Sequence, residues 1–199
     1  LKKSYLTFID IYNIDPKIVP LTDLKLPEAT LVNEGNANYV LASTDFGNRV
    51  ATQWSGSAER DYYLVDVKTG SRKKIIESLS GYASASPNGQ YVVYFDKKKG
   101  QWYSYAIAGG KTTALTQGLN ISFVEEDNDV PDDPSSYGLA GWLEDDKAVL
   151  IYDRYDIWSF SPDGKSTPKN ITNAYGRQNK ITFRYNKTDF DERFISKKE

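Results

Sequence analysis

A short unit of polar turns and apolar runs recurs along the sequence and constrains the fold more than any other feature. The clearest copy starts with a Ser-Pro-Asn-Gly turn at 86–89 and continues through two strand-like runs at 91–96 and 101–106. After a glycine turn it ends on Leu115 and Thr116. Turn, strand, turn, strand and a short apolar exit in this order indicate antiparallel strands joined by tight turns.

Two further copies support the repeat. One keeps the same order, with a polar turn at 145–147, runs at 148–153 and 157–160, and an exit on Ile171 and Thr172. A weaker copy, around the run at 62–67, precedes both. Repeats of about 40 to 55 residues that hold several short strands predict the blades of a β-propeller.

The length sets the number of blades. At roughly 45 residues per blade, the 199 residues predict an all-β segment of about four blades, each a four-stranded antiparallel meander. Because rings close with about four to eight blades, we expect a segment of an incomplete ring. The sequence starts at Leu1 and contains no methionine, so we expect a processed or excised segment.

Turn-rich and proline-rich stretches divide the chain. We predict a partial strand and irregular connector at 1–34, blades at 35–80, 81–117 and 138–175, an acidic insertion at 118–137, and the start of a next blade at 176–199. The expected strands lie at 40–43, 50–54, 62–67 and 73–77, at 81–85, 91–96, 101–106 and 112–115, and at 138–142, 148–153, 157–161 and 169–172. Little helix is expected, since no stretch of ten residues has a clear helical period.

The composition excludes several functions. With 25 basic and 27 acidic residues, the chain lacks the basic excess that nucleic acid attracts. No run of about 18 apolar residues, no basic amphipathic segment and no signal peptide is visible, so we expect no membrane partner. The sequence has no histidine and no cysteine, which removes the usual base of a serine nucleophile and the commonest zinc ligands. We expect no cofactor.

The ordered series of motifs resembles the blades of TolB-like propellers and of the prolyl oligopeptidase family. The third repeat is most similar to dipeptidyl-peptidase-IV-like enzymes of Bacteroidetes, through the runs at 137–142, 152–158 and 175–181. The resemblance covers most of 35–195. Such enzymes join a propeller to an α/β-hydrolase domain whose nucleophile lies in a Gly-x-Ser-x-Gly turn, and that turn is absent here.

The resemblance therefore implies a non-catalytic propeller segment of a serine peptidase. It would gate the access of a peptide substrate to a hydrolase domain in cis, in the periplasm of a Gram-negative bacterium. A stand-alone TolB-like module that binds a protein or ligand is the alternative. Unpaired strands at the open blade edges are expected to permit a homodimer.

The acidic insertion holds the first candidate site. Six carboxylates fall within the nine residues 125–133, a composition typical of a solvated loop. The resemblance to dipeptidyl peptidase IV implies instead that Glu125 and Glu126 bind the free amino terminus of a peptide by charge-assisted hydrogen bonds. A third interpretation is a calcium ion shared by Asp127, Asp129 and Asp132, although the EF-hand spacing is missing.

Arg154 is the second candidate, because it is a single cation among aromatic residues at a strand end. A guanidinium there could bind a carbonyl or carboxylate of a peptide. A structural ion pair with Asp153 or Asp156 is the alternative.

Other motifs have simpler interpretations. The turn at 161–164 resembles a sialidase Asp-box but lacks its spacing, so a hairpin turn is expected. The tryptophans are expected to pack between sheets rather than line a groove; they are Trp54, Trp102, Trp142 and Trp158. Three glycosylation sequons, at Asn120, Asn170 and Asn186, are expected to serve turns and strands.

Without histidine or a nucleophile turn, the purified 199-residue chain is expected to have no peptidase activity. Release of nitroaniline from peptide p-nitroanilides measures this directly. Turnover that a serine-directed inhibitor blocks would contradict the prediction.

Overall fold

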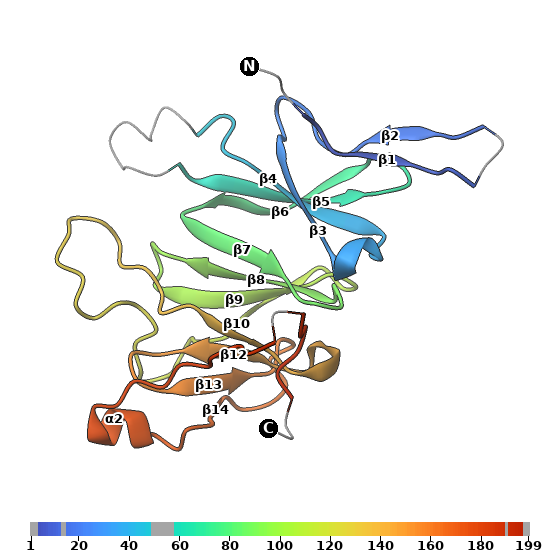
Figure 1. Cartoon of the computed structure of the whole chain (residues 1–199). Coiled ribbons are helices and arrows are strands. Elements are labelled where there is room, and N and C mark those ends of the chain that lie inside the picture. The colour runs from blue at the N-terminus through green and yellow to red at the C-terminus, as the bar shows by residue number, and fades with distance from the viewer. Residues whose placement is uncertain (1–3, 13–14, 49–57, 190, 197–199) are drawn as a thin grey trace. The chain divides into compact units, whose positions relative to one another are not determined.

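Antiparallel strands joined in chain order make up most of the regular structure in the computed structural model (Figure 1). The structure describes residues 4–12, 15–48, 58–189 and 191–196. Within them the strands form three four-stranded sheets and one two-stranded sheet. They belong to two compact units, Leu1–Ser80 and Gly81–Glu199. The predicted all-β class and the four-stranded meander are confirmed, with three full meanders rather than four.

The first unit combines a hairpin with one sheet. The hairpin pairs β1 (Thr7–Ile9) with β2 (Ile18–Pro20), and the sheet has the order β3 (Glu28–Leu31), β4 (Tyr39–Thr44), β5 (Arg60–Asp66) and β6 (Arg72–Leu79), with a short 3-10 helix at Asn33–Gly35. Side chains alternate across a strand, so Val40 and Ala42 of β4 share one face. With Val19 from the hairpin and Val65 from β5 they form the core of this unit.

The irregular connector predicted within 1–34 instead contains two strands, β2 and β3. Proline removes a backbone donor and is tolerated at strand ends and edges. Pro20 ends β2, and Pro27 directly precedes β3, so neither interrupts a ladder. β3 is an outer strand of this sheet and pairs with β4. The strand expected at 50–54, with Trp54, lies outside the described residues.

The second unit contains the two sheets that the sequence repeat predicts best. The first is β7 (Gly81–Ala85), β8 (Tyr91–Asp96), β9 (Gln101–Ala106) and β10 (Lys111–Ala114), and the second is β11 (Leu139–Trp142), β12 (Val149–Tyr152), β13 (Ile157–Phe160) and β14 (Lys169–Asn170). Their bounds agree with the predicted strands to within two residues. A 3-10 helix, η2 (Glu144–Asp146), precedes β12, and a five-residue helix, α2 (Tyr175–Asn179), follows β14. No described helix has the length and apolar character needed to cross a bilayer.

One apolar core joins these two sheets. Phe95 and Trp102 from the first sheet and Ile151 and Phe160 from the second are nearly or fully inaccessible to solvent and belong to one cluster. Each such side chain contributes about 1.5–3 kcal/mol by leaving water. The expected packing role of the tryptophans is confirmed for Trp102 and Trp142 in this cluster, and the partly buried Trp158 packs against it.

The exit residues of the repeat have a shared structural role. The N–H of Trp102, at the start of β9, donates to Thr116 Oγ1 at 3.0 Å. The N–H of Ile157, at the start of β13, donates to Thr172 Oγ1 at 3.2 Å. In both sheets the threonine after the outer strand therefore bonds a backbone donor of the neighbouring strand, which explains why the exits recur in sequence.

The residues after α2 do not begin a further sheet in the described part of 176–199. The backbone of Ile195 instead forms a parallel bridge with Leu143 and donates its N–H to Trp142 O at 2.7 Å. Gly141 has φ +151°, and a Cβ there would lie 2.9 Å from Ile195 Cδ1. The returning segment therefore takes the space that a side chain at 141 would fill, and no strand follows α2 in the described residues.

A buried carboxylate connects the two sheets of the second unit. Asp146 is 1% exposed and accepts hydrogen bonds from the Ser86 hydroxyl at 2.5 Å and from the N–H groups of Asn88 and Gln90 at 3.1 and 3.2 Å. Ser86 Oγ also accepts from the N–H of Tyr91 at 3.0 Å. Asp146 of η2 thus holds the Ser-Pro-Asn-Gly turn that precedes β8.

Replacing Asp146 with alanine would remove the acceptor of the buried Ser86 hydroxyl and of the partly buried Asn88 N–H. The expected cost is about 2–4 kcal/mol in the free energy of unfolding. Asp145→Ala is a matched control, because Asp145 and Asp146 both have positive φ, 60° and 55°, and alanine pays a similar backbone penalty at each. The side chain of Asp145 forms an exposed ion pair with Lys147, and its backbone oxygen, which accepts from Gln90 Nε2, is kept in alanine. Urea unfolding followed by tryptophan fluorescence measures both, and equal losses would contradict the role of Asp146.

Candidate functional site

Arginines and tyrosines gather where the acidic insertion, the turn between β12 and β13, and the segment from α2 onward come together. Figure 1 shows the insertion and α2 at the same end of the second unit. We name this group the arginine–tyrosine cluster; its members are Tyr137, Tyr152, Arg154, Tyr155, Arg177 and Arg184. It is built entirely within the second unit.

Glu126 is the acidic partner of the cluster. Its Oε2 lies 3.3 Å from Arg154 Nη1, and its Oε1 lies 3.6 Å from Arg177 Nη2. Asp127 Oδ2 lies 2.7 Å from Arg154 Nη2. The Glu126 carboxylate raises the pKa of Arg154, so the guanidinium stays charged at any pH at which the protein is folded.

The sequence-predicted residues Glu126 and Arg154 are thus brought together, but they contact each other. Both oxygens of Glu126 already face guanidinium groups, whereas binding a peptide amino terminus would require them to face an ammonium. Glu125 contributes its backbone, whose N–H donates to Ser135 O at 2.8 Å, and the residue is exposed. The structure does not bring the two glutamates together as a pair of acceptors.

The expected ion pair of Arg154 with Asp153 or Asp156 is wrong, because both carboxylates are fully buried and bond elsewhere. Asp153 Oδ1 accepts the N–H groups of Tyr155 and Asp156, each at 2.6 Å. Asp153 Oδ2 accepts the Trp158 indole N–H at 2.9 Å. Arg154 therefore extends from a turn whose backbone Asp153 holds in place.

Asp156 fixes the other side of the cluster. It accepts hydrogen bonds from the Thr172 hydroxyl at 2.6 Å and from the N–H groups of Gly176 and Arg177 at 3.0 and 3.1 Å. Gly176 leaves no room for a side chain, since a Cβ there would lie 2.7 Å from Asp156 Oδ1. The start of α2, and with it Arg177, is consequently positioned by a buried carboxylate.

Aromatic rings complete the cluster. Arg154 and Arg177 each lie 5.3 Å from the ring centroid of Tyr155, and Arg184 lies 4.6 Å from that of Tyr152. These distances are within the range of cation–π attraction. The Tyr137 hydroxyl accepts the N–H of Glu126 at 2.9 Å, and burial raises the pKa of the Tyr137 phenol. The tyrosine rings thus contact the guanidinium groups of the cluster, and Tyr137 bonds the backbone of the acidic insertion.

The sequence interpretation missed Arg177 and Arg184 as site residues. The alternation of tyrosine, arginine and aromatic residues at 152–155 and 183–185 is the signal that would have indicated them. Two nitrogens of Arg177, Nε and Nη2, are buried and make no hydrogen bond within the described residues, although Nη2 lies 3.5 Å from Asp153 Oδ2. Both nitrogens are thus enclosed within the cluster.

The calcium interpretation finds no support in the described residues. No group of three or more acidic side chains there is placed to hold a metal ion. Asp132 instead lies 2.8 Å from Lys97 Nζ, and this lysine lowers the pKa of Asp132. All residues of 125–133 are exposed, as the solvated-loop interpretation predicts.

The remaining motifs serve turns where the structure describes them. Gly164 donates its N–H to Ser161 O at 3.0 Å, which confirms a turn in place of an Asp-box. In the sequon at Asn170, the side-chain Oδ1 accepts the N–H of Thr172 at 3.0 Å, as expected of turn chemistry.

Comparisons with known proteins find likeness in solved structures. TolB from Acinetobacter baumannii is 17% identical with a TM-score of 0.45, covering 84% of this chain and 37% of that one. A putative TolB from Agrobacterium tumefaciens is 18% identical with a TM-score of 0.47, covering 78% and 50%. The chain thus spans half or less of each structure. No family model and no curated protein matches the sequence.

The turn at 161–164 yields a titration prediction. The Ser161 hydroxyl, followed by the N–H and ammonium of Lys165, lowers the pKa of Asp163 from 3.8 to about 2. A depressed carboxyl pKa adds stability that is complete above the unfolded value, so it is lost as the pH falls from about 4 toward 2. Carbon-detected NMR titration should show the low pKa in the parent chain and a rise toward the ordinary value in Ser161→Ala.

Ser166→Ala is the control for this titration, because Ser166 lies in the same connection and makes no described bond to Asp163. It should leave the pKa of Asp163 unchanged. An ordinary pKa in the parent chain, or equal shifts in both variants, would contradict the assigned cause.

Proposed function

We propose that this chain is a non-catalytic β-propeller segment of a prolyl-oligopeptidase-like serine peptidase, and that its blade-end loops shape the access of peptides to a hydrolase domain outside residues 1–199. The support is the ordered motif series at 137–142, 152–158 and 175–181, together with the consecutive four-stranded meanders. As part of the same proposal, the protein acts outside the cytoplasm of a Gram-negative bacterium.

One observation carries the proposal: the arginine–tyrosine cluster lies on loops that two fully buried carboxylates, Asp153 and Asp156, hold in place. Loops on a rigid sheet scaffold are the usual location of binding residues. Arginine donors can bind peptide carbonyl and carboxylate groups, and tyrosine rings add apolar contact at low entropic cost. The surface is therefore suited to select an extended peptide, while it supplies no nucleophile or base.

A stand-alone binding module of the TolB type is the second candidate. The observation that favours it is that the ion pairs and ring contacts described for the cluster all join residues within 126–184. The reading frame beyond Glu199 in the gene distinguishes the two candidates. A continuous frame with a Gly-x-Ser-x-Gly motif would support the peptidase, and a stop codon would favour the module.

In the parent peptidase, Arg154→Ala should lower kcat/KM for peptide substrates roughly tenfold to a hundredfold, since a charge-assisted hydrogen bond contributes about 1.5–3 kcal/mol. Lys165→Ala is the matched control, because this lysine forms only an exposed pair with Asp163. It should leave kcat/KM unchanged. Equal activity of Arg154→Ala and the parent, with the fold intact by circular dichroism, would contradict a role of the cluster in peptide access.

A further inference from the structure

Two guanidinium groups of the arginine–tyrosine cluster converge on a single carboxylate. Glu126 Oε2 lies 3.3 Å from Arg154 Nη1, and Glu126 Oε1 lies 3.6 Å from Arg177 Nη2. Both guanidinium groups also lie 5.3 Å from the ring centroid of Tyr155. Each oxygen of Glu126 thus faces one guanidinium, and the structure shows where this surface holds a carboxylate.

The arginines and the glutamate are held differently by the fold. Arg154 lies in the turn whose backbone the fully buried Asp153 fixes, and the backbone N–H of Arg177 donates to the equally buried Asp156 at 3.1 Å. Glu126 belongs instead to the exposed part of the acidic insertion. The two cations are therefore positioned by the sheet and its turns, whereas the carboxylate between them is carried on a surface loop.

The contacts of Glu126 are long for ion pairs. A charge-assisted hydrogen bond between a guanidinium and a carboxylate is about 2.7–2.9 Å long, and both contacts of Glu126 exceed this length. The side chains of Glu126, Arg154 and Arg177 are 30%, 31% and 34% exposed. Because ion pairs open to solvent contribute little to stability, another carboxylate can take the place of Glu126 at low cost.

The surroundings of this carboxylate favour an anionic ligand. Arg184, the third guanidinium of the cluster, forms no ion pair among the residues that the structure describes. Its Nη2 donates to Arg154 O at 3.3 Å, and its guanidinium lies 4.6 Å from the ring centroid of Tyr152. A ligand ammonium would meet these cations, whereas a ligand carboxylate would meet donors and the tyrosine rings beside them.

We propose that the arginine–tyrosine cluster binds the carboxylate of a peptide, and that Glu126 is an internal ligand that holds the same position until the peptide displaces it. The carboxylate is that of the peptide's carboxyl terminus or of an acidic side chain. The inference rests on the proposed function, in which this cluster contacts peptides, and it adds the chemical class of the ligand. Glu126 then competes with the peptide, which is the opposite of binding its amino terminus.

Calorimetric titration of the full 199-residue chain with N-acetylated tetra-alanine peptides, at low ionic strength, tests the site. The peptide with a free carboxyl terminus should bind about tenfold more tightly than its carboxyl-terminal amide, the effect of one charge-assisted hydrogen bond. An amidated peptide with one glutamate distinguishes the two sources. Tighter binding of the glutamate peptide than of the free-carboxyl peptide assigns the site to acidic side chains, and weaker binding assigns it to the terminus.

Glu126→Gln removes the internal competitor, so it should tighten the binding of the free-carboxyl peptide about threefold to fivefold, as expected for an exposed ion pair. Glu125→Gln is the matched control. It changes the net charge equally, and Glu125 is exposed and forms no ion pair among the described residues, so the affinity should not change. Arg154→Gln should weaken binding about tenfold. Unchanged melting temperatures show that the variants are folded.

Three results would overturn the inference. Equal tightening by Glu126→Gln and Glu125→Gln would indicate general electrostatics, and weaker binding in Glu126→Gln would indicate that the glutamate contacts the ligand. Equal affinity for the free-carboxyl and amidated peptides would show that no carboxylate is recognised. These measurements need no hydrolase domain, so a stop codon after Glu199 would remove the peptidase proposal and leave the binding result unchanged. Conversely, a lost carboxylate preference would leave the role of Arg154 in peptide access to the kcat/KM measurement in the parent peptidase.

Discussion

Buried carboxylates that bond the backbone of turns are the interaction on which the second unit depends. Asp146, Asp153 and Asp156 are at most 1% exposed, and each accepts N–H groups that a turn leaves unpaired. A buried charge is costly unless hydrogen bonds satisfy it. Here the cost is offset by donors that would otherwise be buried without partners, so carboxylate and turn stabilise each other.

Two of these carboxylates hold the loops that carry the arginines, whereas the acidic insertion is held by no buried carboxylate in the described residues. The turn between β12 and β13 and the start of α2 are held at Asp153 and Asp156, and Arg154 and Arg177 extend from them. The acidic insertion meets the same arginines through Glu126, yet its tip at 125–133 is exposed. The guanidinium groups are therefore already in place before a ligand binds. A ligand carboxylate could replace Glu126 as their partner, and little conformational entropy of the backbone would be lost.

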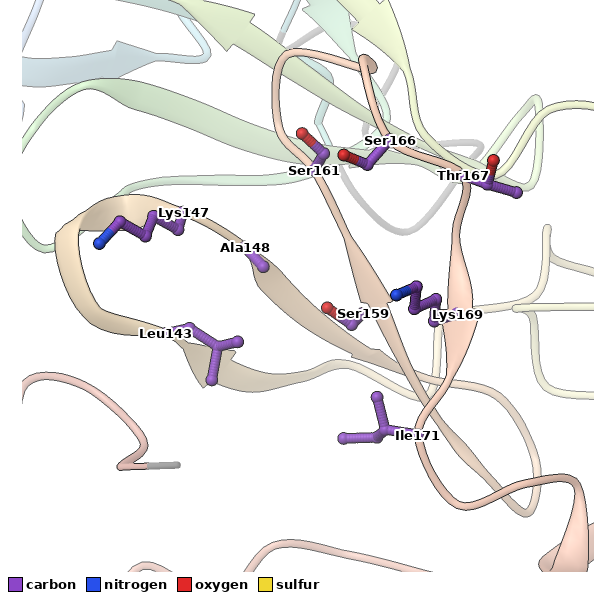
Figure 2. A pocket seen from close by; sticks show the side chains of 9 residues that line it. All are labelled: Leu143, Lys147, Ala148, Ser159, Ser161, Ser166, Thr167, Lys169 and Ile171. Atoms are coloured by element: carbon purple, nitrogen blue, oxygen red, sulfur yellow. The ribbon is translucent and has the colours of Figure 1, made fainter. Parts of the chain in front are cut away.

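The two polar sites of the second unit use different chemistry. The arginine–tyrosine cluster combines planar guanidinium groups with aromatic rings, a set that suits peptide carbonyls and carboxylates. A polar hollow on the same sheet, lined among others by Lys147, Ser159 and Lys169 (Figure 2), combines ammonium groups with hydroxyls, and its lining contains no aromatic side chain. One sheet and its connections therefore present two chemically distinct surfaces.

Sequence alone determined the strands of the second unit, because period-two apolar runs and glycine turns are local signals, as at Tyr91–Asp96 and Gln101–Ala106. It also indicated Glu126 and Arg154. It failed at β3, where proline-rich composition hid a strand that pairs with β4 and packs Ala29 against the core. It also failed at Ile195, which returns to Trp142 across 53 residues. Only the tertiary structure decided that Arg154 pairs with Glu126 rather than with its neighbours Asp153 and Asp156. Burial commits those two carboxylates to backbone donors, and burial depends on contacts that no local pattern contains.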